Sequence, residues 1–254
     1  MKRKLKIVLL FIFLGIFVVS AFQLYGIHNN YEKGDAIYHS VQEQVVKEIT
    51  VPEIKEKGKV KKAEKLISVD FSTLKKKNKD IVGWLYIPDT VISYPLLKGT
   101  DNETYLHQTY DKQSSIFGSI FMDFRNSSDL QDSHTLIYGH NMRNGSMFGS
   151  LKRYNNEADF YKKHKTIYIL TEKATYRYQI FSYHVADVNG AIYTVSYDKE
   201  EDFEWFLKLA KESSYKDTGI DVSTKDKIIT LSTCNNTDTT RFVVHGKYDG
   251  IVGE

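Results

Sequence analysis

The chain has 254 residues, which is enough for one domain of ordinary to large size with extensions. Its formal net charge is only +3, so no basic field covers the whole molecule, and we expect no nucleic acid among its partners. The single cysteine, Cys234, excludes an internal disulfide, and the cysteine and histidine spacings of a zinc site are absent.

The N-terminal region predicts a membrane anchor. Residues 7–27 read IVLLFIFLGIFVVSAFQLYGI, and an uncharged run of about 20 residues matches the hydrocarbon core of a bilayer. Four basic residues within 1–6 predict that this tail stays cytoplasmic and that the chain after His28 lies outside. The alternative is a signal peptide cleaved near 19–21. Because the apolar run continues past that point, we expect an uncleaved anchor.

Residues 28–68 predict an extracellular helix followed by a linker. Apolar residues recur every four positions at Ile37, Val41, Val45 and Ile49, which indicates one amphipathic helix that packs on the domain and ends at Pro52. The stretch 53–65 is rich in lysine and glutamate and is typical of a solvated linker. Contact of its lysines with anionic lipid or a wall polymer is the alternative.

Residues 69–254 predict a mainly β body with two helices. The helices are expected over 70–78 and over 200–213, and the second carries Phe203, Phe206, Leu207 and Ala210 at helical spacing as core residues. Strand patterns occur over 82–87, 91–97, 119–123, 135–138, 166–171, 175–188, 227–233 and 241–247. Many short strands separated by turn signals favour a closed or nearly closed antiparallel barrel.

The segment around Cys234 predicts a β-hairpin with two reactive or charged side chains beside its loop. A strand runs into Cys234, six polar residues follow, and a second strand starts at Arg241. In a hairpin these two residues would be opposite each other, with Cβ atoms about 4.5–5.5 Å apart. A guanidinium beside a thiol favours the thiolate and can bind an oxyanion. The alternatives are an inert buried thiol and an ordinary charged residue at a strand start.

An acyl-transferring thiolate needs a proton donor, and histidine is the usual one. His140 is the best candidate because it ends a strand and follows Gly139 at the start of a loop. His245 lies about 13 Å further along the Arg241 strand, which is too distant, and His134 lies at the opposite end of the His140 strand. The remaining histidines are expected to be surface or structural residues: 28, 39, 107, 164 and 184.

Three segments together resemble the sortase family, the cysteine transpeptidases of the Gram-positive cell wall. They are Thr230-Leu-Ser-Thr-Cys234, Tyr138-Gly-His140 and Arg241. Similarity to class B is added by residues 80–88, 92–95 and 101–102 and by the helix expected before the Cys234 strand. The resemblance covers about residues 70–248 and fits an N-terminal membrane anchor.

The resemblance implies a closed eight-stranded sortase-type barrel with N-terminal helices and an inserted helix before the catalytic strand. It implies that Cys234 cleaves a C-terminal sorting motif (NPxTx-like) after threonine and forms a thioester. An amine of a peptidoglycan precursor or cross-bridge would then resolve the thioester. His140 would act as general acid and then base, and Arg241 would hold the substrate carbonyl or oxyanion. The residues implied to line the substrate groove are Asn102, Tyr138, Ser232 and Thr233.

The partners implied are surface proteins with a sorting signal, the wall amine, and the membrane through residues 7–27. No cofactor is expected, because residues 145–149 lack the lysine of a phosphate-binding loop and nothing resembles the acidic calcium site of some class A members. The loop 235–240 is shorter than is typical of class B, and Asn235 stands where an acidic residue is sometimes found.

Two other functions compete with this one. A papain-like endopeptidase places its cysteine first, at a helix N-terminus, with the histidine later in the chain. Here His140 precedes Cys234, and Cys234 ends a strand, which argues against that class. The second is a membrane-tethered binding module whose thiol is buried and inert.

Overall fold

A computed structural model describes residues 2–51, 54–56, 59–61, 64–234 and 239–252. The chain divides into two compact units, Met1–Ser40 and Val41–Glu254. The compact unit that holds the predicted catalytic residues therefore begins well before residue 69, where the sequence pattern placed the start of the body.

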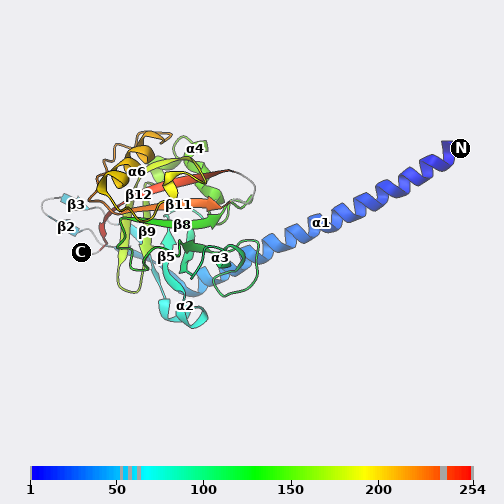
Figure 1. The fold of residues 1–254 in the computed structure, drawn as a ribbon. Coiled ribbons are helices and arrows are strands. Elements are labelled where there is room, and N and C mark those ends of the chain that lie inside the picture. Colours follow the sequence, from blue (N-terminus) through cyan, green and yellow to red (C-terminus); the bar gives the residue numbers. More distant parts are fainter. Residues whose placement is uncertain (1, 52–53, 57–58, 62–63, 235–238, 253–254) are drawn as a thin grey trace. The chain divides into compact units, whose positions relative to one another are not determined.

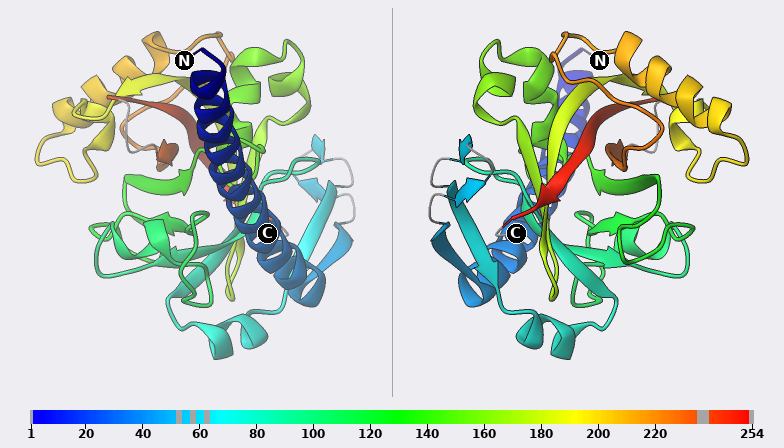
Figure 2. Two further views of the ribbon diagram at one scale, coloured as in Figure 1. Left: turned by 90° about the vertical axis from the view of Figure 1, so that its right-hand side faces the viewer. Right: turned by 90° about the vertical axis from the view of Figure 1, so that its left-hand side faces the viewer.

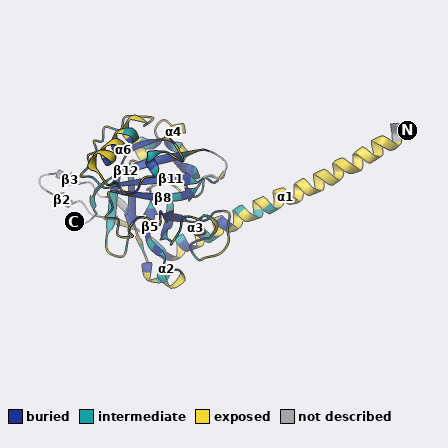
Figure 3. Ribbon diagram, in the orientation of Figure 1, coloured by how far each residue is buried: buried dark blue, intermediate teal, exposed yellow. Residues whose placement is uncertain are grey.

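Helix α1 (Lys2–Val45) runs through the first unit. Its large apolar side chains between Leu5 and Ile27 are exposed, and Figure 3 shows this stretch in yellow. The helix is long and apolar enough to cross a membrane. It is therefore a candidate membrane anchor or signal sequence.

The segment after Val45 differs from the predicted helix and linker. Strand β1 (Val46–Val51) pairs antiparallel with β4 (Glu64–Val69), and this ladder places Ile49 opposite Leu66. The helix prediction is wrong beyond Val45 because β-branched residues dominate β1 and favour an extended backbone that β4 can pair. Within the predicted linker, β2 (Ile54–Glu56) pairs with β3 (Lys59–Lys61), while Pro52 lies outside the described residues.

Helix α2 (Phe71–Lys77) matches the short helix predicted over 70–78. Asp70 caps its N-terminus: the carboxylate accepts hydrogen bonds from Thr73 N at 3.1 Å and from the Thr73 hydroxyl at 2.7 Å. Together with the Ser72 hydroxyl, these bonds lower the pKa of Asp70 to about 2.

The described part of the second unit contains a closed barrel of eight strands (Figure 1). The order around the barrel is β10-β12-β11-β8-β7-β6-β5-β9, and β9 pairs with β10. The strands are β5 (Ile81–Tyr86), β6 (Ser93–Lys98), β7 (Ile120–Met122), β8 (His134–His140), β9 (Thr166–Leu170), β10 (Thr175–Asp187), β11 (Ile228–Cys234) and β12 (Thr240–Ile251). Each lies where the strand patterns predicted one, so the mainly β closed barrel is confirmed.

The barrel is mixed, and the prediction of a purely antiparallel barrel is wrong for two pairs. Strands β6 and β7 are parallel, and so are β8 and β11. A parallel pair needs a long crossover connection. The connection from β6 to β7 contains helix α3 (Thr104–His107), and the one from β8 to β11 contains β9, β10 and all the later helices. Side-chain alternation within a strand does not reveal its partner's direction.

The remaining helices border the barrel, as the two views of Figure 2 show. They are η1 (Gly149–Lys152), α4 (Arg153–Asn156), α5 (Phe160–Lys163), η2 (Ala191–Tyr193) and α6 (Glu200–Glu212). The four residues of α6 predicted as core are buried in one cluster with Phe181, Ile228 and Val243 of the barrel strands. This packing confirms that the apolar stripe of α6 is core.

Candidate active site

The two strands that carry the predicted nucleophile and acid–base group are neighbours. Strands β8 and β11 run parallel in register, and their last pair is His140 with Cys234. Residues paired in register on neighbouring strands project from the same face of the sheet. Both residues are half-buried at the same end of the barrel. The pairing brings together two side chains that are 94 positions apart in the printed numbering.

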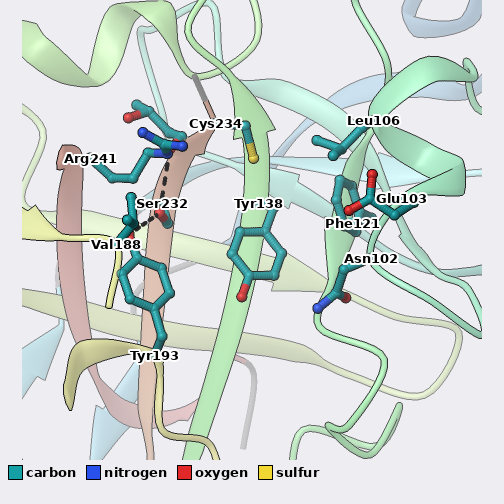
Figure 4. A pocket seen from close by; sticks show the side chains of 11 residues that line it. Asn102, Glu103, Leu106, Phe121, Tyr138, Val188, Tyr193, Ser232, Cys234 and Arg241 are labelled. Carbon is teal, nitrogen blue, oxygen red and sulfur yellow. Dashed lines mark hydrogen bonds between the residues drawn. The ribbon is translucent and has the colours of Figure 1, made fainter. Parts of the chain in front are cut away.

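Arg241 reaches the same place from the neighbouring strand. The β11–β12 ladder pairs Ser232 with Val243, so a further step of two residues along the hairpin leads to Cys234 and Arg241. The Arg241 Nη1 atom donates to the carbonyl of Thr240 at 2.8 Å. Figure 4 shows Arg241 and Cys234 directed toward the same space. Residues 235–238 of the connecting loop, including Asn235, lie outside the described residues.

Cys234 and Arg241 line a groove of about 320 Å³. Figure 4 shows Tyr138 and Cys234 between two walls, with Asn102 on one and Tyr193 on the other. The other lining residues are Glu103, Leu106, Phe121, Val188, Ser232 and Thr233. The four predicted substrate residues, Asn102, Tyr138, Ser232 and Thr233, thus all face this groove, and their role in binding stays a prediction.

His140 has a defined tautomer in its neutral form. Its Nε2 atom lies 2.6 Å from the carbonyl oxygen of Leu106. Because a carbonyl only accepts hydrogen bonds, Nε2 carries the proton and Nδ1 is the basic nitrogen. Burial lowers the pKa of His140; the Leu106 bond opposes this shift, and the charge of nearby His107 adds to it.

Burial favours the thiol form of Cys234. Burial raises its pKa to about 12, although Arg241 and a backbone hydrogen bond from Gly139 act in the opposite direction. With the pKa of His140 lowered as well, the pair is neutral near pH 7. The sulfur becomes a nucleophile only when its proton is removed, so the site requires a base.

Comparison with known proteins assigns the family. A Sortase domain model matches residues 85–249 of the chain. The chain belongs to the sortase family. Sortase B from Listeria monocytogenes is 39% identical over 181 residues, which cover 70% of this chain and 73% of the relative. Sortase B from Staphylococcus aureus is 35% identical over 176 residues, covering 68% of this chain and 72% of the relative.

Solved sortase B structures share the fold. The structure described as a Staphylococcus aureus sortase B–substrate complex is 35% identical, with a TM-score of 0.67 over 70% of this chain and 84% of that chain. Sortase B from B. anthracis in complex with AAEK1 is 30% identical, with a TM-score of 0.71 over 87% of this chain and 98% of that chain. The resemblance to class B is confirmed, and this sortase is a cysteine transpeptidase rather than a papain-like protease or an inert binding module.

Five lining residues of the sortase groove were missed by the sequence patterns: Glu103, Leu106, Phe121, Val188 and Tyr193. Leu106 lies on α3, which is too short to give a periodic signal, and Tyr193 lies on η2, far in sequence from the other wall. Phe121 and Val188 had a local signal, as parts of the predicted strands 119–123 and 175–188. Only the tertiary structure brings Tyr193 next to the other residues of the groove.

Three of the histidines that the sequence did not favour as catalytic, His134, His184 and His245, are buried in this sortase. His134 and His245 are fully buried and lie 2.7 and 2.8 Å from the Thr230 hydroxyl. His184 is also buried and stacks on His245. Among the described residues, His245 Nε2 has no hydrogen-bond partner. Burial lowers the pKa of His134 and His184 to about 4 and that of His245 well below its usual range.

Because these histidines are buried, we expect the free energy of unfolding to fall as the pH falls below about 6.5. The unfolded chain binds protons at these residues while the folded chain does not, so acid favours unfolding by up to about 1.4 kcal/mol per pH unit per histidine. The loss should extend down to a pH of about 4. Urea unfolding of the full chain in mild detergent at a series of pH values measures it.

A matched variant distinguishes the effect of histidine protonation on stability from the effect of carboxylate protonation. The capping carboxylate Asp70 loses its contribution only below its ordinary pKa of 3.8, outside the histidine window. His184→Gln should remove about one proton from the pH slope between pH 6.5 and pH 4. A free energy of unfolding that stays constant across this window would contradict the prediction.

Proposed function

We propose that this sortase is a membrane-anchored extracellular transpeptidase that cleaves a C-terminal sorting motif (NPxTx-like) after threonine and transfers the protein to a peptidoglycan amine. The observation that carries the proposal is one groove containing both Cys234 and Arg241, with His140 paired to Cys234 on the next strand. This arrangement supplies a nucleophile, a positive hydrogen-bond donor and a proton carrier at one point.

The proposed reaction moves one proton through Nδ1 of His140. That nitrogen takes the Cys234 thiol proton while sulfur bonds to the threonine carbonyl carbon, and Arg241 stabilises the oxyanion. The peptide C–N bond then breaks, and Nδ1 returns the proton to the leaving amine. The acceptor amine next attacks the thioester carbon and displaces sulfur. Its surplus proton passes through Nδ1 back to the thiolate, which restores the neutral pair.

The groove has the dimensions and chemistry of a peptide site. It is open, about 320 Å³, and lined by both aromatic and polar side chains. The related sortase B from Staphylococcus aureus has been solved as a substrate complex, which supports a substrate site in this fold. We assign Asn102, Tyr138, Ser232 and Thr233 to substrate binding in this chain because all four line its groove.

We assign residues 7–27 to the membrane and residues 1–6 to the cytoplasm. The apolar side chains of this stretch are exposed, and the basic residues precede it. Residues 28–68 and the catalytic part, 69–254, would then be extracellular, in a single-pass cell-membrane protein. Protease added outside intact cells should digest the catalytic part; full protection would contradict this orientation.

The decisive experiment uses the full chain in detergent with a fluorescence-quenched NPxTx peptide and an amine acceptor of the cross-bridge type. We expect cleavage after threonine and a ligated product identified by mass spectrometry. A peptide with the threonine replaced by valine is the control, and it should not be cleaved. Equal cleavage of both peptides, or none of either, would overturn the proposed substrate.

Arg241→Lys tests whether the guanidinium fork is needed. Lysine keeps the positive charge but lacks the rigid planar guanidinium whose N–H donors point in fixed directions. We expect kcat/KM to fall by about 10²–10³-fold, the usual effect of losing an oxyanion donor. The rate at which a small reagent alkylates Cys234 should change little, because the charge beside the thiol remains. Full activity of this variant would show that Arg241 acts only as a point charge.

A further inference from the structure

A buried carboxylate lies behind the groove and takes no part in the proposed chemistry. Asp123 follows β7 directly and is fully buried. Its Oδ2 accepts hydrogen bonds from Asn102 Nδ2 at 3.0 Å, from the Tyr138 hydroxyl at 2.9 Å and from Arg125 Nη2 at 2.7 Å. Its Oδ1 accepts from the Arg125 backbone N at 3.0 Å and Nε at 2.8 Å. Burial raises the pKa of Asp123, but these hydrogen bonds together outweigh burial and hold the pKa at about 2, so the carboxylate is ionised.

Asp123 determines which polar atoms two groove residues can offer. The Asn102 amide is held at both ends, because its Oδ1 also accepts from the backbone N of Phe124 at 3.0 Å. It cannot flip, and its one remaining N–H is a donor. Tyr138 donates its only hydroxyl hydrogen to Asp123, so its oxygen is left as an acceptor. Asn102 and Tyr138 are thus held by the same oxygen of Asp123, one with a free N–H donor and the other with a free oxygen acceptor. Such a pair complements the C=O and N–H of an amide group.

Arg125 links the same carboxylate to the opposite wall. Its Nη2 atom also donates to the carbonyl of Tyr193 at 3.2 Å. The Tyr193 hydroxyl lies 3.0 Å from Ser232 Oγ, and both of these residues line the groove. One ion pair, with Nη2 and Oδ2 2.7 Å apart, therefore connects the Asn102 wall, Tyr138 and the Tyr193 wall.

We infer that Asp123 and Arg125 are positioning residues that set the spacing of the two walls and present Asn102 and Tyr138 to an amide group of the peptide substrate. The inference rests on the proposed function, because it assumes that this groove holds the peptide. Neither residue reaches the reacting atoms. Their loss should weaken recognition of the peptide more than the chemistry at Cys234.

The first test compares Asp123→Asn with wild type on the fluorescence-quenched sorting peptide, using the full chain in detergent. Asparagine has the same shape, but its NH2 would face donors and Arg125 would lose its charge partner. We expect kcat/KM to fall about 10- to 100-fold, mostly through KM, as positioning errors of this size do. The matched control is Asp159→Asn, which breaks an exposed ion pair with Lys162 and should leave kinetics unchanged.

Two further readouts separate positioning from general stability. Alkylation of Cys234 by a small reagent does not use the groove walls, and its rate should be unchanged in Asp123→Asn. In an Asn102→Ala background, Asp123→Asn should cause a smaller further loss than it does in wild type, because the Asn102 contact is already absent and only the Tyr138 and Arg125 contacts of Asp123 remain. If the losses in kcat/KM of the two single variants simply multiply in the double variant, or if Asp123→Asn keeps the wild-type KM, the inference is overturned.

Two results would each require a further measurement: an Asp123→Asn variant that does not fold, and a wild-type chain that does not cleave the peptide. If Asp123→Asn does not fold, Arg125→Lys carries the same test, because lysine keeps the charge but loses the two-pronged contact. If wild type fails to cleave the peptide, the proposed function falls, and the Asn102 amide still tests the positioning claim. Its side-chain NMR signal, assigned by its loss in Asn102→Ala, should be protected from exchange in wild type and unprotected in Asp123→Asn. Equal protection in both would overturn it.

Discussion

Alanine in place of Cys234 is expected to abolish both cleavage and transfer, with kcat lowered on the order of 10⁶-fold, as when a nucleophile is removed from other acyl-transfer enzymes. The reason is structural as well as chemical. The sequence has no second thiol, and among the described residues that line the groove beside Cys234 there is no other strong nucleophile. The measurement is single-turnover cleavage of the sorting peptide, with mass spectrometry to detect the thioester on the protein.

Binding should survive this change. The substitution removes one sulfur atom from a half-buried position and leaves both groove walls and Arg241 in place. The Cys234→Ala chain should therefore bind the peptide with about the wild-type Kd, as judged by fluorescence anisotropy. Cys234→Ser is the matched variant: a hydroxyl is a much weaker nucleophile, so it should also be nearly inactive. Cleavage at the wild-type rate in either variant would exclude Cys234 as the nucleophile.

Removing His140 is expected to have the second largest effect. With a thiol pKa of about 12, only a very small fraction of Cys234 is ionised near pH 7, and the reaction depends on a base. His140→Ala should lower kcat/KM by about 10²–10⁴-fold. The full chain in detergent, measured against the sorting peptide over a wide pH range, gives both the size of the loss and its pH dependence.

The dependence of activity on pH identifies the role of His140. Wild-type activity should be lost as the pH falls through the pKa of His140, which lies below its usual value of 6.5, because the protonated imidazole cannot accept the thiol proton. His140→Ala should lack this limb, and its residual rate should keep rising with pH toward the thiol pKa of about 12. His164→Gln, a histidine bonded to the carbonyl of Pro88, is the control and should keep the wild-type profile. A wild-type profile in His140→Ala would rule out its acid–base role.

Much of the fold was predictable because strands and α6 carry local periodic signals. The eight barrel strands have alternating or short apolar patterns, and the Phe203–Ala210 stripe has helical spacing. The hairpin at Cys234 was predictable for the same reason, since two strands joined by a short polar loop are neighbours. These signals lie within a few residues of each other in the chain.

Other features could not be predicted from local patterns. Val46–Val51 followed a helical stripe, yet it forms β1 because β4 supplies a partner from more than ten residues away. The parallel β8–β11 pair brings Cys234 next to His140, although β9 and β10 lie between these two strands in the sequence. Asp123 and Arg125 gave no motif at all, since their importance lies in contacts with Asn102, Tyr138 and Tyr193.

The sequence by itself determined the residue types of the site, the positions of the barrel strands, the family and the candidate anchor. Tertiary structure alone decided which strands run parallel, which side chains share the groove, and the directions in which the pKa values of Cys234 and His140 shift. The physical reason is the range of the forces involved. Periodicity and turn chemistry act between near neighbours in the chain, whereas burial, hydrogen bonding and the pKa of Cys234 depend on residues that only the closed barrel brings together.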